Sequence, residues 1–204
     1  LGFLKFLPGA PINNLVEKHQ YRYQSTPPYE LISHQELSAK EVLYLKQFVD
    51  IFDRYYNSKR FRFSINTLLE KMDPVALFNR LLEYHDSHAL LMNPVSLDEQ
   101  YRIFRDTFYP VPTPMERDLL KLDYLYSQRS FRLPGILSTK PPVKTWKRDR
   151  KTPIIPFDHE IEISGSQALL KEAKHPVYYA IAHSQNGDGY FRRPTVNAIS
   201  EPEA

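Results

Sequence analysis

The chain has 204 residues with 27 basic and 24 acidic side chains, and its formal net charge of +3 argues against a nucleic-acid partner held by electrostatics alone. A hydrophobic content of 42% is that of a globular protein with one large or two small cores. The sequence contains no cysteine, which excludes disulfides, thiolate zinc sites, cysteine nucleophiles and any iron–sulfur cluster held by the chain's own thiolates.

Targeting signals are not apparent in the sequence. No apolar run reaches the roughly 20 residues that a membrane helix needs, and the first segment lacks the basic flank and cleavage site of a signal peptide. We therefore expect a cytoplasmic protein without a membrane partner.

An apolar segment opens the chain. Residues 1–7 predict a buried strand, which Pro8 and Gly9 end. No initiator Met or polar segment precedes it, so we expect the chain to be part of a longer polypeptide. A strand separated from its neighbours frays, pairs with strands near the C-terminus, or pairs with the same strand of another copy to give a homo-oligomer.

The next segments are short. Pro11 suits the first turn of a helix, and the apolar residues that follow it predict a brief helix. Residues 21–37 contain two adjacent prolines and little periodicity, so we expect an ordered crossing loop there.

Residues 38–129 are predicted to form a helical bundle. Capping signals at Ser38, Asp73, Ser96 and Thr113 mark four helix starts, and apolar spacing predicts another helix near residues 61–72. The first of these helices carries apolar residues around much of its circumference, which predicts burial on several sides. The last is expected to bury Met115, Leu119, Leu122 and Tyr126.

The composition changes after the bundle. Residues 130–156 are rich in proline and basic side chains and predict a linker. Residues 157–204 predict a small α/β tail, with an amphipathic stretch at 166–173, a strand at 177–182 and a hairpin turn at 186–189. The expected fold class is mainly α (α+β), with about five bundle helices, this small C-terminal α/β unit and an orphan N-terminal strand.

Two histidines form the weak metal candidate of the chain. His85 and His88 are three residues apart near a helix end, and Asp86 lies between them. A third strong ligand at a diagnostic spacing is missing, and histidines at a helix end commonly bond the last carbonyls. We favour the structural interpretation, so no metal is assigned.

A basic patch surrounds the single tryptophan. It could hold a phosphate or stack a base, although such a run is more commonly a solvated linker. Its residues are Lys144, Trp146, Lys147, Arg148, Arg150 and Lys151.

Three carboxylates alternate along the first predicted strand of the tail. Asp158, Glu160 and Glu162 would share one strand face, where they could serve acid–base chemistry or bind calcium. A solvent-facing acidic row that discourages edge pairing is the commoner structure, and we favour it.

Several strings together resemble a known family. Residues 2–11 read GFLKFLPGAP, residues 27–30 read PPYE, and residues 54–61 read RYYNSKRF. With Leu45 and Lys46, they resemble cobalamin-binding radical S-adenosylmethionine (SAM) proteins at the point where the catalytic barrel ends and a C-terminal helical domain of unassigned function begins. The likeness is most specific over residues 1–62.

This resemblance implies a division of roles. Residues 1–37 would be the end of the radical SAM barrel plus the crossing loop, and Lys5 would be a candidate for lining the substrate chamber. The B12-binding and radical SAM domains would precede this chain, and they would supply the [4Fe–4S] cluster, the S-adenosylmethionine site and the cobalamin. This chain would hold no cofactor and no catalytic residue of its own.

Three functions follow from these expectations. The leading hypothesis is a non-catalytic accessory domain that covers the barrel mouth of a radical SAM enzyme or docks a partner. The second is a stand-alone helical interaction module that binds a peptide or protein. A third, weaker one is nucleic-acid binding through the segment around Trp146.

Overall fold

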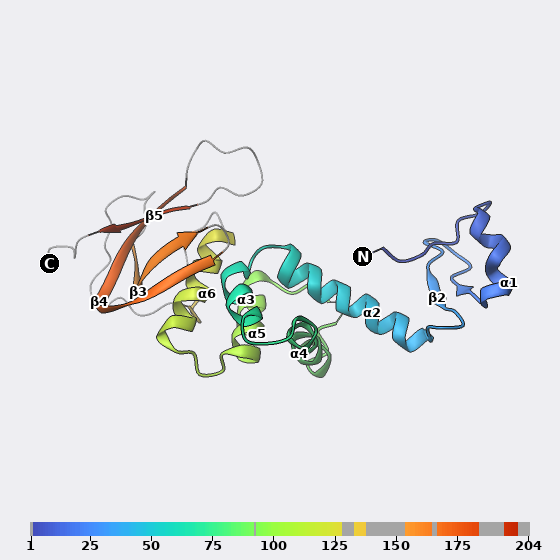
Figure 1. Cartoon of the computed structure of the whole chain (residues 1–204), viewed down its shortest axis with the longest axis horizontal. Coiled ribbons are helices and arrows are strands. Elements are labelled where there is room, and N and C mark those ends of the chain that lie inside the picture. The colour runs from blue at the N-terminus through green and yellow to red at the C-terminus, as the bar shows by residue number, and fades with distance from the viewer. Residues whose placement is uncertain are drawn as a thin grey trace. The chain divides into compact units, whose positions relative to one another are not determined.

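A computed structural model of the chain describes residues 2–91, 93–127, 133–137, 154–164, 167–183 and 194–199. The chain divides into two compact units, Leu1–Arg54 and Tyr55–Ala204 (Figure 1). The boundary between the units lies inside the helical bundle predicted for residues 38–129. Helix α2 (Ala39–Phe52) belongs to the first unit, where it contacts strand β2 (Leu31–Ser33). The combination of helices with small antiparallel sheets confirms the α+β fold class.

The first unit consists of short elements around a small core. The buried residues of this core are Phe6, Leu31 and Val42, and Ile51 is buried at the far end of α2. Strands β1 and β2 pair antiparallel, so the expectation of a crossing loop without regular structure at residues 21–37 is wrong. The elements before α2 are the 3₁₀-helix η1 (Pro11–Leu15), α1 (Val16–His19), β1 (Arg22–Tyr23) and β2 (Leu31–Ser33).

The N-terminal segment is also paired within the chain. Lys5 forms an antiparallel bridge with Glu30, so the expectation of an orphan strand is wrong for this segment. Two backbone hydrogen bonds flank the bridge, because residues 29–31 present donors and acceptors on the side away from β1.

Helix α2 begins as its sequence predicts. The Ser38 hydroxyl accepts from the Glu41 amide and the Glu41 carboxylate accepts from the Ser38 amide, which completes a capping box. Only Val42 and Ile51 are buried along the helix, so the expected burial on several sides is wrong. The wide apolar stripe therefore stays largely half-buried or exposed.

The helices of the second unit start at local capping signals. Asp73 accepts from the Ala76 amide ahead of α4, Ser96 accepts from the Glu99 amide ahead of α5, and Thr113 with Glu116 forms a reciprocal pair ahead of α6. The bounds are α3 Arg62–Leu69, α4 Pro74–Ser87, α5 Leu97–Phe108 and α6 Pro114–Ser127, and a π-helical turn, Asp53–Asn57, follows α2.

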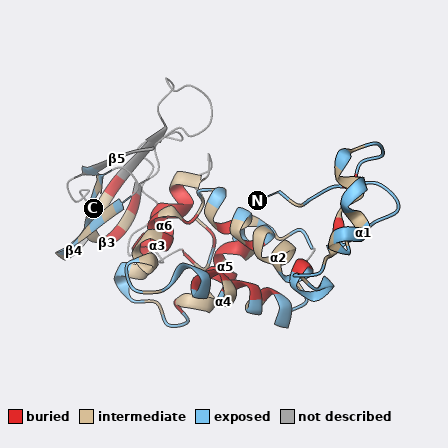
Figure 2. Ribbon diagram, turned by 45° about the vertical axis from the view of Figure 1, so that its right-hand side comes forward, coloured by how far each residue is buried: buried red, intermediate tan, exposed pale blue. Residues whose placement is uncertain are grey.

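Two groups of buried side chains hold this unit together (Figure 2). Tyr55, Phe61, Tyr101 and Phe104 pack ring against ring among the helices. The second group joins α3 and α6 to the sheet, and it consists of Phe63, Leu119, Leu122, Leu125, Ile155, Phe157 and Tyr179. Met115 is 38% exposed, so its expected place in the core is wrong.

The C-terminal region is a three-stranded antiparallel sheet within the described residues. The strands β3 (Ile154–Ser164), β4 (Gln167–His183) and β5 (Pro194–Ile199) lie in the order β3-β4-β5. The expected α/β character is wrong here, because residues 167–172 pair with β3 as part of β4. β3 also begins three residues before residue 157, inside the expected linker. The predicted turn at 186–189 lies outside the described residues.

Candidate functional site

The N-terminal segment runs antiparallel to residues 29–31 through the isolated bridge at Lys5 and leaves its other edge open. The Phe6 amide donates to the Tyr29 carbonyl at 2.8 Å, and the Leu31 amide donates to the Leu4 carbonyl at 2.9 Å. In this antiparallel geometry the amide and carbonyl of Lys5 point away from residues 29–31. Within the described part of the chain, neither Lys5 backbone group forms a hydrogen bond. The edge can therefore accept another strand.

Phe6 and its two neighbours in sequence lie on opposite faces of this segment. Phe6 is 2% exposed and stacks on Tyr23 at 4.4 Å, so its face belongs to the core. Lys5 is exposed on the opposite face, because successive side chains of a strand alternate. Leu7 and Ile32 lie on that same face by alternation and cross-strand pairing, and they are 54% and 41% exposed.

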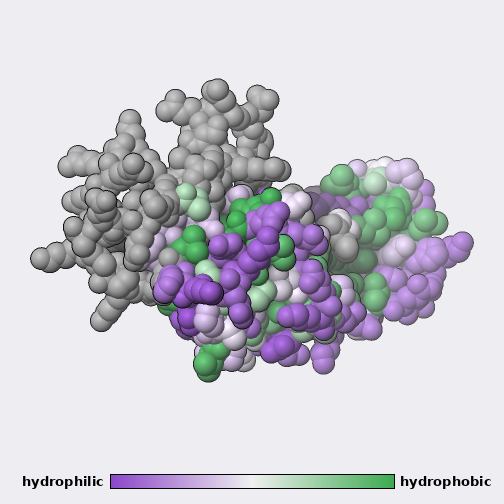
Figure 3. All heavy atoms as spheres, turned by 60° about the vertical axis from the view of Figure 1, so that its left-hand side comes forward, coloured by the Kyte–Doolittle hydropathy of each residue, from purple (hydrophilic) through white to green (hydrophobic). Residues whose placement is uncertain are grey.

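We call this surface, made of Lys5, Leu7 and Ile32, the outer face. Apolar exposure is concentrated in its unit: the first unit carries six of the ten exposed large hydrophobic side chains of the described residues. The six are Leu4, Leu7, Leu15, Ile32, Leu43 and Tyr44. Figure 3 shows hydrophobic residues reaching the surface of this unit, on the right of the view. An exposed apolar surface beside a free strand edge is typical of an interaction site.

An ion pair borders the outer face. The Lys46 ammonium donates to the Glu30 carboxylate at 2.7 Å and lies 5.5 Å from the centre of the Phe3 ring. That hydrogen bond is the main reason why the pKa of Glu30 lies below its usual value, and the charge of Lys5 adds a smaller effect. Lys5 therefore stands at an exposed position beside a carboxylate that Lys46 already neutralises.

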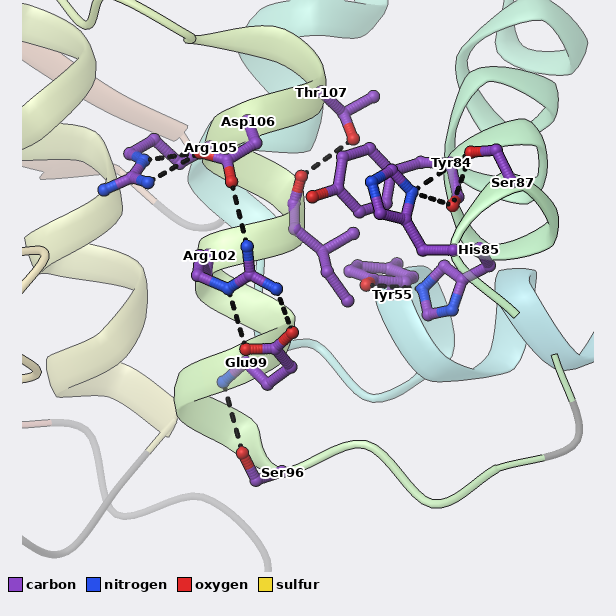
Figure 4. A network of polar contacts seen from close by, with 12 residues as sticks. Tyr55, Tyr84, His85, Ser87, Ser96, Glu99, Arg102, Arg105, Asp106 and Thr107 are labelled. Atoms are coloured by element: carbon purple, nitrogen blue, oxygen red, sulfur yellow. Dashed lines mark hydrogen bonds and ion pairs between the residues drawn. The ribbon is translucent and has the colours of Figure 1, made fainter. Parts of the chain in front are cut away.

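The structure separates the two histidines of the weak metal candidate. His85 is buried and its Nε2 lies 2.9 Å from the Tyr55 hydroxyl (Figure 4). His88 is exposed, stacks on Tyr84 at 4.1 Å, and places its Nδ1 2.8 Å from the Tyr84 carbonyl. No group of three or more potential ligands occurs among the described residues. His85 is thus a core hydrogen-bonding group and His88 a helix-end group.

Helix α5 carries a charged network next to this pair. Arg102 bonds the Glu99 carboxylate and lies 3.4 Å from Asp106 (Figure 4). The hydrogen bond from Arg102 is the main cause that lowers the pKa of Glu99. These groups are partly exposed and spaced three and four residues apart, which is typical of ion pairs that support a helix.

A buried polar cluster fastens α6 to β3. One Asp118 oxygen accepts from the amides of Asp158 and His159 and from the His159 ring, at 2.7–3.0 Å, and the other accepts from Lys121 at 2.9 Å. Lys121 also donates to the Pro156 carbonyl at 3.1 Å. Asp118 is fully buried and Lys121 is 1% exposed. We call Asp118, Lys121 and His159 the α6–β3 clasp.

The clasp lies at an irregularity of the sheet. The pairing of β3 with β4 shifts between Phe157 and His159, where Asp158 of β3 lies opposite residues 173–176 of β4, so the extra residues of this bulge are on β4. Asp118 accepts the two successive amides at this point. Further along, the Ile161 amide donates to the Tyr179 hydroxyl at 2.7 Å. Side-chain oxygens thereby accept hydrogen bonds from three backbone amides of β3, which is an edge strand of the sheet.

A second buried carboxylate joins α6 to the start of α3. Asp123 accepts from the Phe63 amide at 2.8 Å and from the Ser64 amide at 2.9 Å. Burial raises the pKa of Asp123 to about 7, while the two backbone donors act in the opposite direction. Asp123 therefore has a structural role, which is to orient α3 against α6.

The acidic row and the basic patch are the remaining groups that the sequence singled out. Glu160 and Glu162 are exposed on the edge strand β3, and Asp158 lies 3.5 Å from Arg117. The basic patch from Lys144 to Lys151 lies outside the described residues. Among the helices of the described part, none is long and apolar enough to span a membrane.

Comparison with known proteins gives one match. The model of the family described as "Protein of unknown function (DUF4080)" matches residues 17–155. The chain belongs to this family. The match covers all of α2 to α6, and the N-terminal segment with Lys5 precedes it. No curated protein and no solved structure matches the chain.

Sequence reasoning missed the buried polar groups of this DUF4080 chain. Asp118 and Lys121 are three residues apart in α6, and their partners are about 40 residues away in β3. The one local signal is that both are charged residues next to the buried apolar residues Leu119 and Leu122. Charged residues on an apolar helix face indicate a buried pair, but their spacing does not identify the partner strand.

Proposed function

We propose that this chain is a non-catalytic accessory domain of a cobalamin-binding radical SAM enzyme, and that its outer face docks at the mouth of the catalytic barrel. The observation that carries the proposal is the free edge at Lys5 beside exposed Leu7 and Ile32. A surface of this kind suits a neighbour that adds a strand and covers apolar side chains.

The chemistry of the chain supports an accessory role. A cluster that cleaves S-adenosylmethionine needs thiolates, and the sequence has no cysteine. The residues of this chain therefore do not fit a [4Fe–4S] cluster, which would have to be held elsewhere in the enzyme. What the domain contributes is enclosure, since reactive intermediates need a site from which water is excluded.

Lys5 has a defined part in this proposal. Its side chain lies on the exposed face of the strand, opposite the buried Phe6. Docking at the barrel mouth would direct the ammonium group toward the chamber, where a positive charge favours an anionic group of the substrate.

The test uses the intact enzyme with Leu7→Glu and Ile32→Glu, which place charge on the outer face. The measurement is the ratio of S-adenosylmethionine cleaved to product formed. We expect this ratio to rise severalfold, because a loosened domain admits water to the radical site.

Val75→Glu is the matched control, since Val75 is 54% exposed on α4 of the second unit. It should leave the ratio unchanged. An unchanged ratio in both outer-face variants would reject the accessory role at the barrel mouth.

A further inference from the structure

A cleft opens between α3, the start of α6 and the facing ends of β3 and β4. Its volume is about 430 Å³, which lies within the range of ligand sites. Its lining mixes polar and apolar side chains, and the apolar ones include Phe63 and Met115 on the helical side and Leu169 on the sheet side. All of these elements belong to the second unit. We call it the hairpin cleft.

The charge of the hairpin cleft has one sign. Glu70 lines it from the end of α3 and Glu162 from β3, and its described lining contains no lysine or arginine. An anionic ligand would meet Glu70 and Glu162, of which only Glu162 is paired among the described residues, with the exposed Lys171 outside the described lining, whereas a cation would be attracted by both carboxylates. The lining therefore selects for a positively charged ligand.

The exposed apolar side chains at the cleft indicate that the ligand also has apolar groups. Met115 is 38% exposed and Leu169 is 56% exposed, and both border the cleft. Large apolar side chains around a hollow are typical of binding surfaces, because a ligand that covers them removes apolar area from water. The ligand thus combines a cationic group with aliphatic groups.

We propose that the hairpin cleft binds an extended peptide segment in which lysine or arginine alternates with aliphatic residues. The cationic side chains face Glu70 and Glu162, and the aliphatic ones cover Leu169 and Met115. Lys171 bonds Glu162 at 3.0 Å in the unbound chain, but both groups are mostly exposed. Exchange of this ion pair for a ligand cation therefore costs little.

The probe is an acetylated, amidated pentapeptide that alternates leucine and lysine, titrated into the full chain and followed by amide chemical shifts. We expect saturable shifts in α3 and in the ends of β3 and β4. The matched peptide with glutamate in place of lysine should not bind at about 1 mM. Added salt should weaken the lysine peptide, because its ion pairs are exposed.

Variants locate the site. Glu70→Gln and Glu162→Gln should each weaken binding about two- to fivefold, which is the range for a partly exposed ion pair. Leu169→Ser should weaken it as well. The matched controls are Glu160→Gln, in the same strand but outside the cleft, and Leu43→Ser, 53% exposed on α2; both should bind as the unaltered chain does.

Three outcomes would overturn the proposal. One is the absence of binding by the lysine peptide, and another is equal binding by the glutamate peptide. The third is equal affinity for hexylamine and for the peptide, which would assign the cleft to small amines. The substituted positions are partly or wholly exposed, and the amide spectrum of each variant shows directly whether it is folded.

Discussion

The α6–β3 clasp should contribute strongly to the stability of the second unit. Asp118→Asn replaces one acceptor oxygen with a donor, which then faces either Lys121 or the β3 amides. Breaking one partner of a buried ion pair costs about 3–5 kcal/mol. Because an asparagine oxygen still accepts some of these bonds, we expect a loss of about 3 kcal/mol in unfolding free energy.

A substitution of Lys121 allows the interaction energy between Asp118 and Lys121 to be measured. Lys121→Met keeps the aliphatic volume but removes the charge that faces Asp118, and we expect it to cost about 2–3 kcal/mol. In the double variant Asp118→Asn with Lys121→Met, the asparagine amide no longer faces an ammonium group. The loss of unfolding free energy in the double variant should therefore be about 2 kcal/mol smaller than the sum of the losses in the two single variants.

Urea unfolding followed by circular dichroism measures these four free energies. Lys171→Met is the matched control, because Lys171 pairs with Glu162 in a mostly exposed bridge. It should leave the unfolding midpoint unchanged. Additive losses, or single losses no larger than that of the control, would show that the clasp does not hold α6 to β3.

Three further predictions concern the same unit. Because burial raises the pKa of Asp123 to about 7, the folded chain holds a proton that the unfolded chain has released, so stability should fall as pH rises from about 4 to 7. Asp123→Asn should flatten this part of the stability curve in urea titrations at several pH values, and an unchanged slope would assign it to another group. Tyr55→Phe removes the hydroxyl that contacts His85 and should cost about 1–2 kcal/mol by thermal or urea unfolding, whereas no loss would mean that this contact adds nothing to stability. Ser96→Ala removes the cap of α5 and should cost about 1 kcal/mol in the same assay, with Ser96→Asp as the variant that retains the stability.

Helix starts were predictable because their signals are local. Ser38 with Glu41, Asp73 with Pro74, and Ser96 each precede a helix that begins at the next residue. A cap involves side chains and amides within three residues, so its geometry follows from the sequence alone.

Strand partners were harder to predict because their signals are distant. Residues 21–37 contain prolines that suggest a loop, yet the Gln24 amide finds the Glu30 carbonyl and Lys5 lies opposite Glu30. Likewise, residues 167–172 extend β4 because β3 is available to pair with them. Tertiary pairing overrides such local preferences.

The burial of α2 shows the same limit. Its apolar residues surround much of the helix, which predicts neighbours on several sides, but only Val42 and Ile51 are buried. Periodicity reports how much apolar surface a helix carries. It does not report whether this chain or a partner covers that surface.

The exchange rate of the Lys5 amide tests the docking proposal most directly. In the isolated chain this N–H points away from residues 29–31, so it should exchange freely, while the Phe6 amide, bonded to the Tyr29 carbonyl, serves as the protected internal control. In the intact enzyme a strand added at this edge should slow Lys5 exchange by at least about tenfold. Protection that appears in the isolated chain only as concentration rises would instead indicate pairing between copies. Equally fast Lys5 exchange in the isolated chain and in the intact enzyme would contradict docking at this edge.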